Sequence, residues 1–151
     1  MTVEKTLFLE DFQPGRSWSG GPRPINEAEI IAFARQYDPQ DFHTDPELAR
    51  ESPLGFLCAS GVQTFGIAHR LMVDSVLNQT HVVAGGSVDN FRMRLPVVPG
   101  DQLSLHVEVE HTNPHSKKPD RGWVTFLVRL RREDEKTVLE YRTTILILRQ
   151  G

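Results

Sequence analysis

Apolar positions along the chain change their spacing near its middle, from a helical period to an alternating one. In residues 26–37, apolar side chains recur at every third or fourth position, which predicts an amphipathic helix. In residues 103–109, Leu or Val occupies every other position, which is typical of a half-buried strand. The pattern predicts an α+β fold, with most helices in the first half and most strands in the second.

The first helix has clear signals at both ends. Asn26 is a favoured N-cap residue, so the helix is expected to start directly after it. It should stop at Tyr37, because Asp38 precedes Pro39 and the residue before a proline is disfavoured in the α region. Residues 38–44 are then expected to form a loop.

Two further helices are expected before the strands. Asp45 suits an N-cap, which predicts a short helix over residues 45–51. Residues 57–77 are the most apolar helical stretch and, in their first half, are apolar on nearly all sides, which predicts a buried helix. Gly61 and Gly66 each cost helix stability, so we expect the backbone of another part of the chain to approach closely at both.

Glycine and proline mark the remaining boundaries. Pro14 and Gly15 predict a turn, and residues 16–24 read as an irregular or edge segment. Behind the long helix we expect an antiparallel sheet of four or five strands. Four of them are predicted over residues 87–97, 103–109, 123–130 and 138–148.

Length and charge narrow the function classes. The 151 residues are expected to form a single domain, 1–151. Lys and Arg number 17 against 20 Asp and Glu, and this net charge of −3 argues against a nucleic-acid partner. We expect no membrane segment, because no apolar run reaches the length of about 18 residues that a spanning helix needs. Cys58 is the single cysteine, which favours a cytoplasmic location, and without a His pair at ligand spacing no metal site is expected.

The stretch from Asp38 to His43 carries the candidate chemistry. An acid and an imidazole lie five residues apart, just after a helix. Such a pair can hold one water molecule and move its protons near neutral pH. The spacing alone leaves a second interpretation open, in which Asp38 is only a turn residue before proline.

The segments Phe33-Ala34, Tyr37-Asp38 and His43-Thr44-Asp45-Pro46, followed by Ala49, resemble the motif of the MaoC-like (R)-specific enoyl-CoA hydratases. The motif of that family runs Asp, any residue, Asn, Pro, any residue, His, with an Ala several positions later. Other matches follow in the family's order along nearly the whole chain. They are the segments Phe12-Gln13-Pro14-Gly15 (the family's first strand), Cys58-Ala59-Ser60-Gly61, Phe91-Arg92, Leu95-Pro96-Val97 and Pro99-Gly100-Asp101.

The resemblance implies a hot dog fold, in which an antiparallel sheet wraps a long central helix. It implies reversible syn hydration of a trans-2-enoyl thioester, usually on coenzyme A, with Asp38 taking a proton from water and His43 delivering one to the α-carbon. Gln40, Ser60 and Gly61 would bind the substrate, the backbone N–H of Gly61 facing the thioester oxygen. It implies no cofactor other than the coenzyme A of the acyl-CoA substrate, and a homodimer formed by pairing sheets.

Two positions depart from the motif. Gln40 stands where the family has Asn, and Asp41 where it has Pro. We expect Asp41 and Asp45, which flank His43, to favour the protonated imidazole and so to weaken it as a base.

Two other functions stay open. One is a hot dog acyl-CoA thioesterase, whose carboxylate usually lies in or near the central helix. The first turns of that helix offer Ser60, Gln63 and Thr64 here, and Asp74 comes only near its end. The other is a non-catalytic acyl-binding homologue, which the departures at Gln40 and Asp41 would suit.

Overall fold

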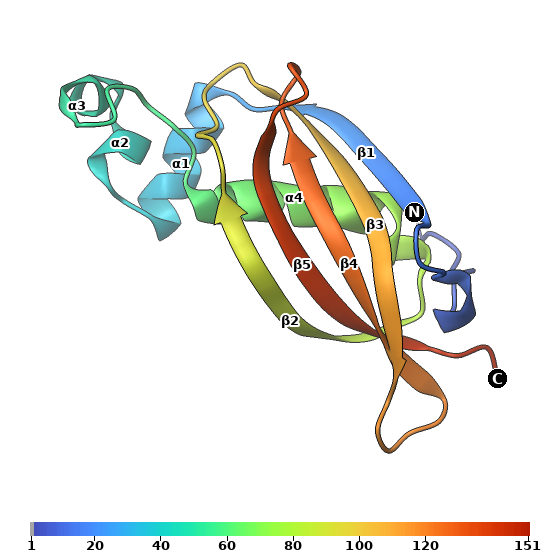
Figure 1. The fold of residues 1–151 in the computed structure, drawn as a ribbon. Coiled ribbons are helices and arrows are strands. Elements are labelled where there is room, and N and C mark those ends of the chain that lie inside the picture. The colour runs from blue at the N-terminus through green and yellow to red at the C-terminus, as the bar shows by residue number, and fades with distance from the viewer. Residues whose placement is uncertain (1) are drawn as a thin grey trace.

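The computed structural model describes residues 2–151 and shows one antiparallel sheet curved around a long helix (Figure 1). The order of its five strands is β1-β3-β4-β5-β2, so β1 and β2 form the two edges. This is the α+β arrangement that the hydrophobic pattern predicts. The strands are β1 (Ser17–Pro24), β2 (Val82–Met93), β3 (Gln102–Pro114), β4 (Arg121–Arg131) and β5 (Thr137–Leu148).

Most helices lie between the first two strands in the sequence. The longest, α4, crosses the concave face of the sheet, while α1, α2 and α3 gather at one end of it (Figure 1). None of the helices in residues 2–151 is long and apolar enough to cross a membrane. The helices are α1 (Glu27–Tyr37), α2 (Asp41–Thr44), α3 (Pro46–Glu51) and α4 (Gly61–Ser75), with 3₁₀ turns η1 (Leu9–Asp11) and η2 (Leu77–Gln79).

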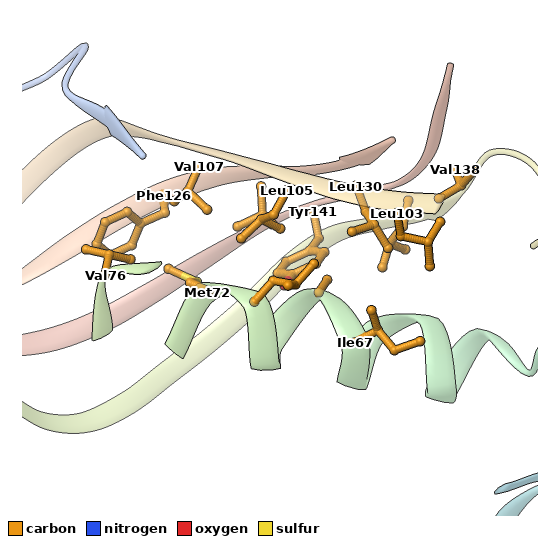
Figure 2. Packing of buried hydrophobic residues seen from close by; sticks show 14 of the residues in the cluster. Ile67, Met72, Val76, Leu103, Leu105, Val107, Phe126, Leu130, Val138 and Tyr141 are labelled. Carbon is orange, nitrogen blue, oxygen red and sulfur yellow. The ribbon is translucent and has the colours of Figure 1, made fainter. Parts of the chain in front are cut away.

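The core lies between α4 and the inner face of the sheet (Figure 2). Alternate residues of β3 are buried there from Leu103 to Val109, which confirms the predicted alternation. Met72 and Ala68 of α4 are fully buried against these strands, and Phe126 of β4 is likewise inaccessible. This packing holds α4 in place and so fixes the position of its first turn.

The side of α4 that faces away from the sheet is open. Val62 is 58% exposed, and Gly66, His69 and Arg70 are also exposed. The prediction of a helix buried all round is therefore wrong for the single chain. No atom lies within 4 Å of where a Cβ of Gly66 would be, so the predicted close approach is wrong at that residue.

The segments before the first strand and before α4 differ from prediction. Residues 9–11 form η1, and Phe12 ends it with its ring buried against Phe126, so the expected first strand at Phe12–Gly15 is absent from the described residues. The turn at Gly15 is confirmed by its φ of 91°. The long helix starts at Gly61 rather than residue 57, because Ser60 caps it and residues 57–59 form no regular secondary structure.

Residues 38–44 were expected to form a loop, and their second half is the helical turn α2. Gln40 is extended and acts as its N-cap residue, and the Thr44 hydroxyl donates to the Gln40 carbonyl at 3.1 Å. A single turn is too short to produce a periodic apolar pattern, which is why the sequence predicts only a loop here. The predicted helices over 27–37 and 45–51 are confirmed, with Asn26 and Asp45 as their caps.

Candidate active site

A cavity of about 410 Å³ lies where α1 ends, α2 turns, α4 begins and β2 ends. The sheet and the three small helices meet at this end of the molecule (Figure 1). The cavity brings together all five site residues expected from the sequence. They are Asp38, Gln40, His43, Ser60 and Gly61.

Asp38 is held at the end of α1 with both carboxylate oxygens engaged. Its N–H donates to the Ala34 carbonyl at 2.8 Å, which ends the helix. Oδ1 accepts a hydrogen bond from Gln40 Nε2 and Oδ2 accepts one from Ser60 Oγ, each at 2.7 Å. The Gln40 hydrogen bond, followed by that of Ser60 and the charge of His43, outweighs partial burial and lowers the pKa of Asp38. Asp38 is therefore a carboxylate at neutral pH, and the longer amide of Gln40 does reach it.

His43 lies on α2 with its side chain buried. Its Nδ1 is 2.6 Å from the carbonyl oxygen of Cys58, and since a carbonyl only accepts, Nδ1 carries the proton. Nε2 then faces Asp38, with 3.4 Å between Nε2 and Oδ2. This tautomer leaves Nε2 as the nitrogen that can gain or lose a proton in the cavity.

The carboxylates next to His43 in sequence do not contact it. Asp41 is exposed at the start of α2, and Asp45 Oδ1 accepts the backbone N–H groups of Glu47 and Leu48 at 2.9 and 3.2 Å. Within the described residues, Asp38 is the acidic partner within ion-pair distance of His43. The expectation that Asp41 and Asp45 set the charge of His43 is therefore corrected, because the paired carboxylate comes from α1.

The segment before α4 positions His43 through its backbone. The Cys58 N–H donates to the Phe42 carbonyl at 3.1 Å, and the Ala59 N–H donates to the Val97 carbonyl at 2.8 Å. The Cys58 carbonyl is thereby aimed at His43. Burial raises the pKa of the Cys58 thiol, so it stays protonated and is a poor nucleophile. The contact between the Cys58 carbonyl and His43 could not be predicted from the sequence, because every residue type carries a backbone carbonyl.

Ser60 joins the start of α4 to the carboxylate. Its side chain is fully buried, accepts the Val62 N–H at 3.2 Å as the N-cap and donates to Asp38 Oδ2. The Ser60 hydroxyl therefore both donates a hydrogen bond and accepts one within the protein. This arrangement fixes the distance between Asp38 and the helix N-terminus.

Gly61 is the first residue of α4, and its N–H belongs to the turn in which a helix offers no internal partner. A Cβ at this position would overlap the sulfur of Met93, at the end of β2. Another part of the chain does approach closely at Gly61, but it is the side chain of Met93 and not the backbone that was predicted. Met93 itself, which also lines the cavity, is a site residue that sequence reasoning missed.

Replacing Ser60 with Ala is expected to destabilise the fold by about 1 kcal/mol, because α4 loses its N-cap. Urea unfolding followed by circular dichroism measures this. Ser75→Ala, the same change at the other end of α4, is the matched control and should cost less than about 0.5 kcal/mol. If both variants lose the same free energy of unfolding, the N-cap hydrogen bond of Ser60 does not stabilise α4.

The Ser60 variant also has a pH signature. A carboxyl with a lowered pKa in the folded state contributes stability that is present above its unfolded-state pKa and lost as pH falls through the folded-state value. Ser60→Ala removes one cause of the lowered pKa of Asp38. The stability difference between wild type and variant should therefore narrow below about pH 4.

Comparisons with known proteins find matches over most of the chain. A family model described as "MaoC like domain" matches residues 11–126. YdeM of Bacillus subtilis (strain 168), described as uncharacterized, is 29% identical over 143 residues, covering 95% of this chain and 100% of the relative. A MaoC-like dehydratase from Rhodospirillum rubrum superposes with a TM-score of 0.89 at 32% identity, covering 97% of this chain and 99% of that one.

The fold likeness extends to more distant structures. The (R)-hydratase PhaJ1 from Pseudomonas aeruginosa gives a TM-score of 0.75 at 19% identity, covering 95% of this chain and 86% of that one. At this identity the likeness concerns the fold alone. It confirms the predicted hot dog fold, with the sheet wrapped around α4.

Proposed function

The chain belongs to the MaoC-like domain family, a hydratase and dehydratase family, and from this premise we propose that it adds water reversibly to a trans-2-enoyl-CoA. One observation carries the proposal. The Asp38 carboxylate and Nε2 of His43 face each other at 3.4 Å in a cavity at the N-terminus of α4. Addition of water to an activated double bond needs a base that takes a proton from the water and an acid that donates a proton to the carbon.

The two side chains would divide the proton transfers. Asp38, ionised at neutral pH, takes a proton from the water as it attacks the β-carbon. His43 acts in its imidazolium form: while Nδ1–H stays on the Cys58 carbonyl, the proton on Nε2 goes to the α-carbon and leaves the neutral Nδ1–H tautomer. The proton that Asp38 took from water then passes to Nε2, 3.4 Å from Oδ2, and restores both groups. Gln40 and Ser60 act as positioning residues, since both donate to Asp38. Dehydration of the 3-hydroxyacyl thioester follows the same steps in reverse.

The start of α4 would stabilise the charge that develops on the thioester oxygen. The Gly61 N–H lies in the first turn, where unpaired N–H groups and the helix dipole favour negative charge. One such donor is typically worth about 3–4 kcal/mol in the transition state. The reaction moves protons and water only, so the proposal needs no cofactor beyond the coenzyme A of the substrate.

The experiment incubates the protein with crotonyl-CoA and longer trans-2-enoyl-CoAs, and follows enoyl absorbance and free thiol separately. Loss of absorbance without thiol release supports the hydratase. Thiol release would instead support a thioesterase, although Asp74, the carboxylate on α4, lies outside the cavity and pairs with Arg70 at 3.0 Å. If neither the enoyl absorbance nor the free thiol changes with any of these substrates, the result would favour a non-catalytic acyl-binding protein.

We also propose that the working form is a homodimer joined along β2. This edge strand is exposed along its whole length and presents apolar side chains, among them Val83 and Met93. The opposite edge, β1, carries Pro22 and Pro24, which cannot donate to a further strand. An exposed edge with free N–H and C=O groups is a template for a second copy.

Val83→Lys is expected to shift the protein from the mass of two 17.1 kDa chains to that of one. A charge on an edge strand opposes pairing, and twofold symmetry places it in the interface twice. Light scattering after gel filtration measures the mass. Val3→Lys, an equally conservative control at a residue 48% exposed outside the sheet, should stay dimeric. A wild-type protein that runs as a single chain would contradict the dimer.

A further inference from the structure

A second cavity, of about 650 Å³, lies farther along α4, between that helix and β2. Residues four positions apart lie on one ridge of α4, and this ridge runs from the first cavity to the second. Gly61 lines the catalytic cavity, while Phe65, His69 and Val73 line the second. Within the described residues, no residue lines both cavities. Thr64 also lines the catalytic cavity, so the boundary on α4 falls at Phe65, about 6 Å from Gly61 along the helix axis.

Three aromatic rings meet beside this boundary. Phe65 and Tyr141 line the second cavity. Phe91 lines neither cavity but lies on β2 between Val88, which lines the second cavity, and Met93, which lines the catalytic one. Phe65 of α4 makes edge contacts with Phe91 of β2 and Tyr141 of β5, with ring centroids 5.3 and 5.1 Å apart. Phe91 and Tyr141 stack at 5.8 Å. Each ring touches the other two, and they come from the three elements that enclose the gap between helix and sheet. We call Phe65, Phe91 and Tyr141 the aromatic barrier.

The rings of the aromatic barrier differ in how deeply they are buried. Tyr141 is 1% exposed and reaches from β5 toward α4 within the core (Figure 2). Phe91 is 39% exposed at the edge of the sheet. Removing Tyr141 would disrupt the core, whereas removing Phe91 opens the boundary with little loss of core packing.

We propose that the aromatic barrier limits the acyl site to short chains, so that the substrate class is short-chain enoyl thioesters. This rests on the proposed hydratase function, since it describes the acyl end of that same site. With the thioester oxygen at the Gly61 N–H, an acyl chain that follows the α4 ridge meets Phe65 after one helical turn. Beyond the barrier lies an apolar cavity lined by residues such as Val73, Val88 and Ile145, which a longer chain could fill once the barrier is open.

The test compares kcat/KM for trans-2-dodecenoyl-CoA with that for crotonyl-CoA. Wild type should favour crotonyl-CoA. Phe91→Ala should raise the dodecenoyl-to-crotonyl ratio by at least about tenfold, since the fit of a few methylenes in an apolar pocket is worth that much. Phe91→Leu, which keeps more of the packing, should give an intermediate ratio. Phe33→Ala is the matched control, because Phe33 packs on Tyr37 of α1 and contacts none of the three rings of the barrier.

A wild-type protein that hydrates both substrates equally, or a ratio unmoved by Phe91→Ala, would overturn the barrier. Calorimetric titration with butyryl-CoA and dodecanoyl-CoA, which cannot be hydrated, separates this proposal from the reaction itself. If no enoyl-CoA is hydrated, the proposed function fails, yet a gain in dodecanoyl-CoA affinity of about tenfold in Phe91→Ala would still support the barrier. Equal affinities in wild type and variant, or no binding of either thioester, would overturn it.

Discussion

Replacing Asp38 with Asn is expected to lower kcat/KM for enoyl-CoA hydration by about 10²–10⁴-fold, the usual contribution of a general acid–base group. The amide keeps the size of the side chain but cannot accept a proton from water. Initial rates of absorbance loss with crotonyl-CoA measure the effect, and the melting temperature establishes that the variant is folded.

Asp41→Asn is the matched control for this variant. It makes the same chemical change three residues along, at an exposed side chain outside the catalytic cavity. Its rate should stay close to that of wild type. If Asp38→Asn retains near-normal activity, or if the two variants lose activity equally, Asp38 is not the base.

His43→Ala is expected to cost about as much, again about 10²–10⁴-fold, because the proton for the α-carbon loses its donor. The pair works as a unit, so the double variant with Asp38→Asn should be little slower than the slower single variant. Losses that multiply in the double variant would show that the two residues act independently. His106→Ala, on β3 and outside the cavity, controls for the general effect of removing an imidazole.

The elements that could be predicted from the sequence are those with their own local signals. The helix over 27–37 has a cap, an apolar period and a terminating Asp-Pro pair, and the structure confirms it. The alternation of β3 is confirmed as well. By contrast, Val82 to Gly86 belong to β2 although glycines interrupt the pattern, because their pairing with β5 holds them in the strand. Tertiary pairing has no signature in the strand's own residues.

At the site, too, the residues can be predicted from the sequence while the contacts between them cannot. The spacing of Asp38 and His43 makes both residues candidates, and the resemblance adds Gln40, Ser60 and Gly61. The structure brings all five to one cavity. Their contacts could not be predicted. Ser60 donates to Asp38 across 22 positions. That contact depends on how α1 and α4 pack, which no local pattern describes.

The role of the backbone is also invisible in the sequence. The Cys58 carbonyl selects the tautomer of His43, and the Phe42 and Val97 carbonyls hold the segment that carries it. The Cys58 thiol takes no such part, because it is buried and protonated. Main-chain geometry thus sets which nitrogen of His43 faces Asp38.

The most direct test of the account is hydration of crotonyl-CoA in water labelled with ¹⁸O, with the products analysed by mass spectrometry. Water addition at the β-carbon predicts 3-hydroxybutyryl-CoA that carries one ¹⁸O atom, with the thioester intact, and almost none of it with the Asp38→Asn variant. Label found only in the carboxylate of a free acid would identify thioester hydrolysis and contradict the account, as would unlabelled, unchanged crotonyl-CoA.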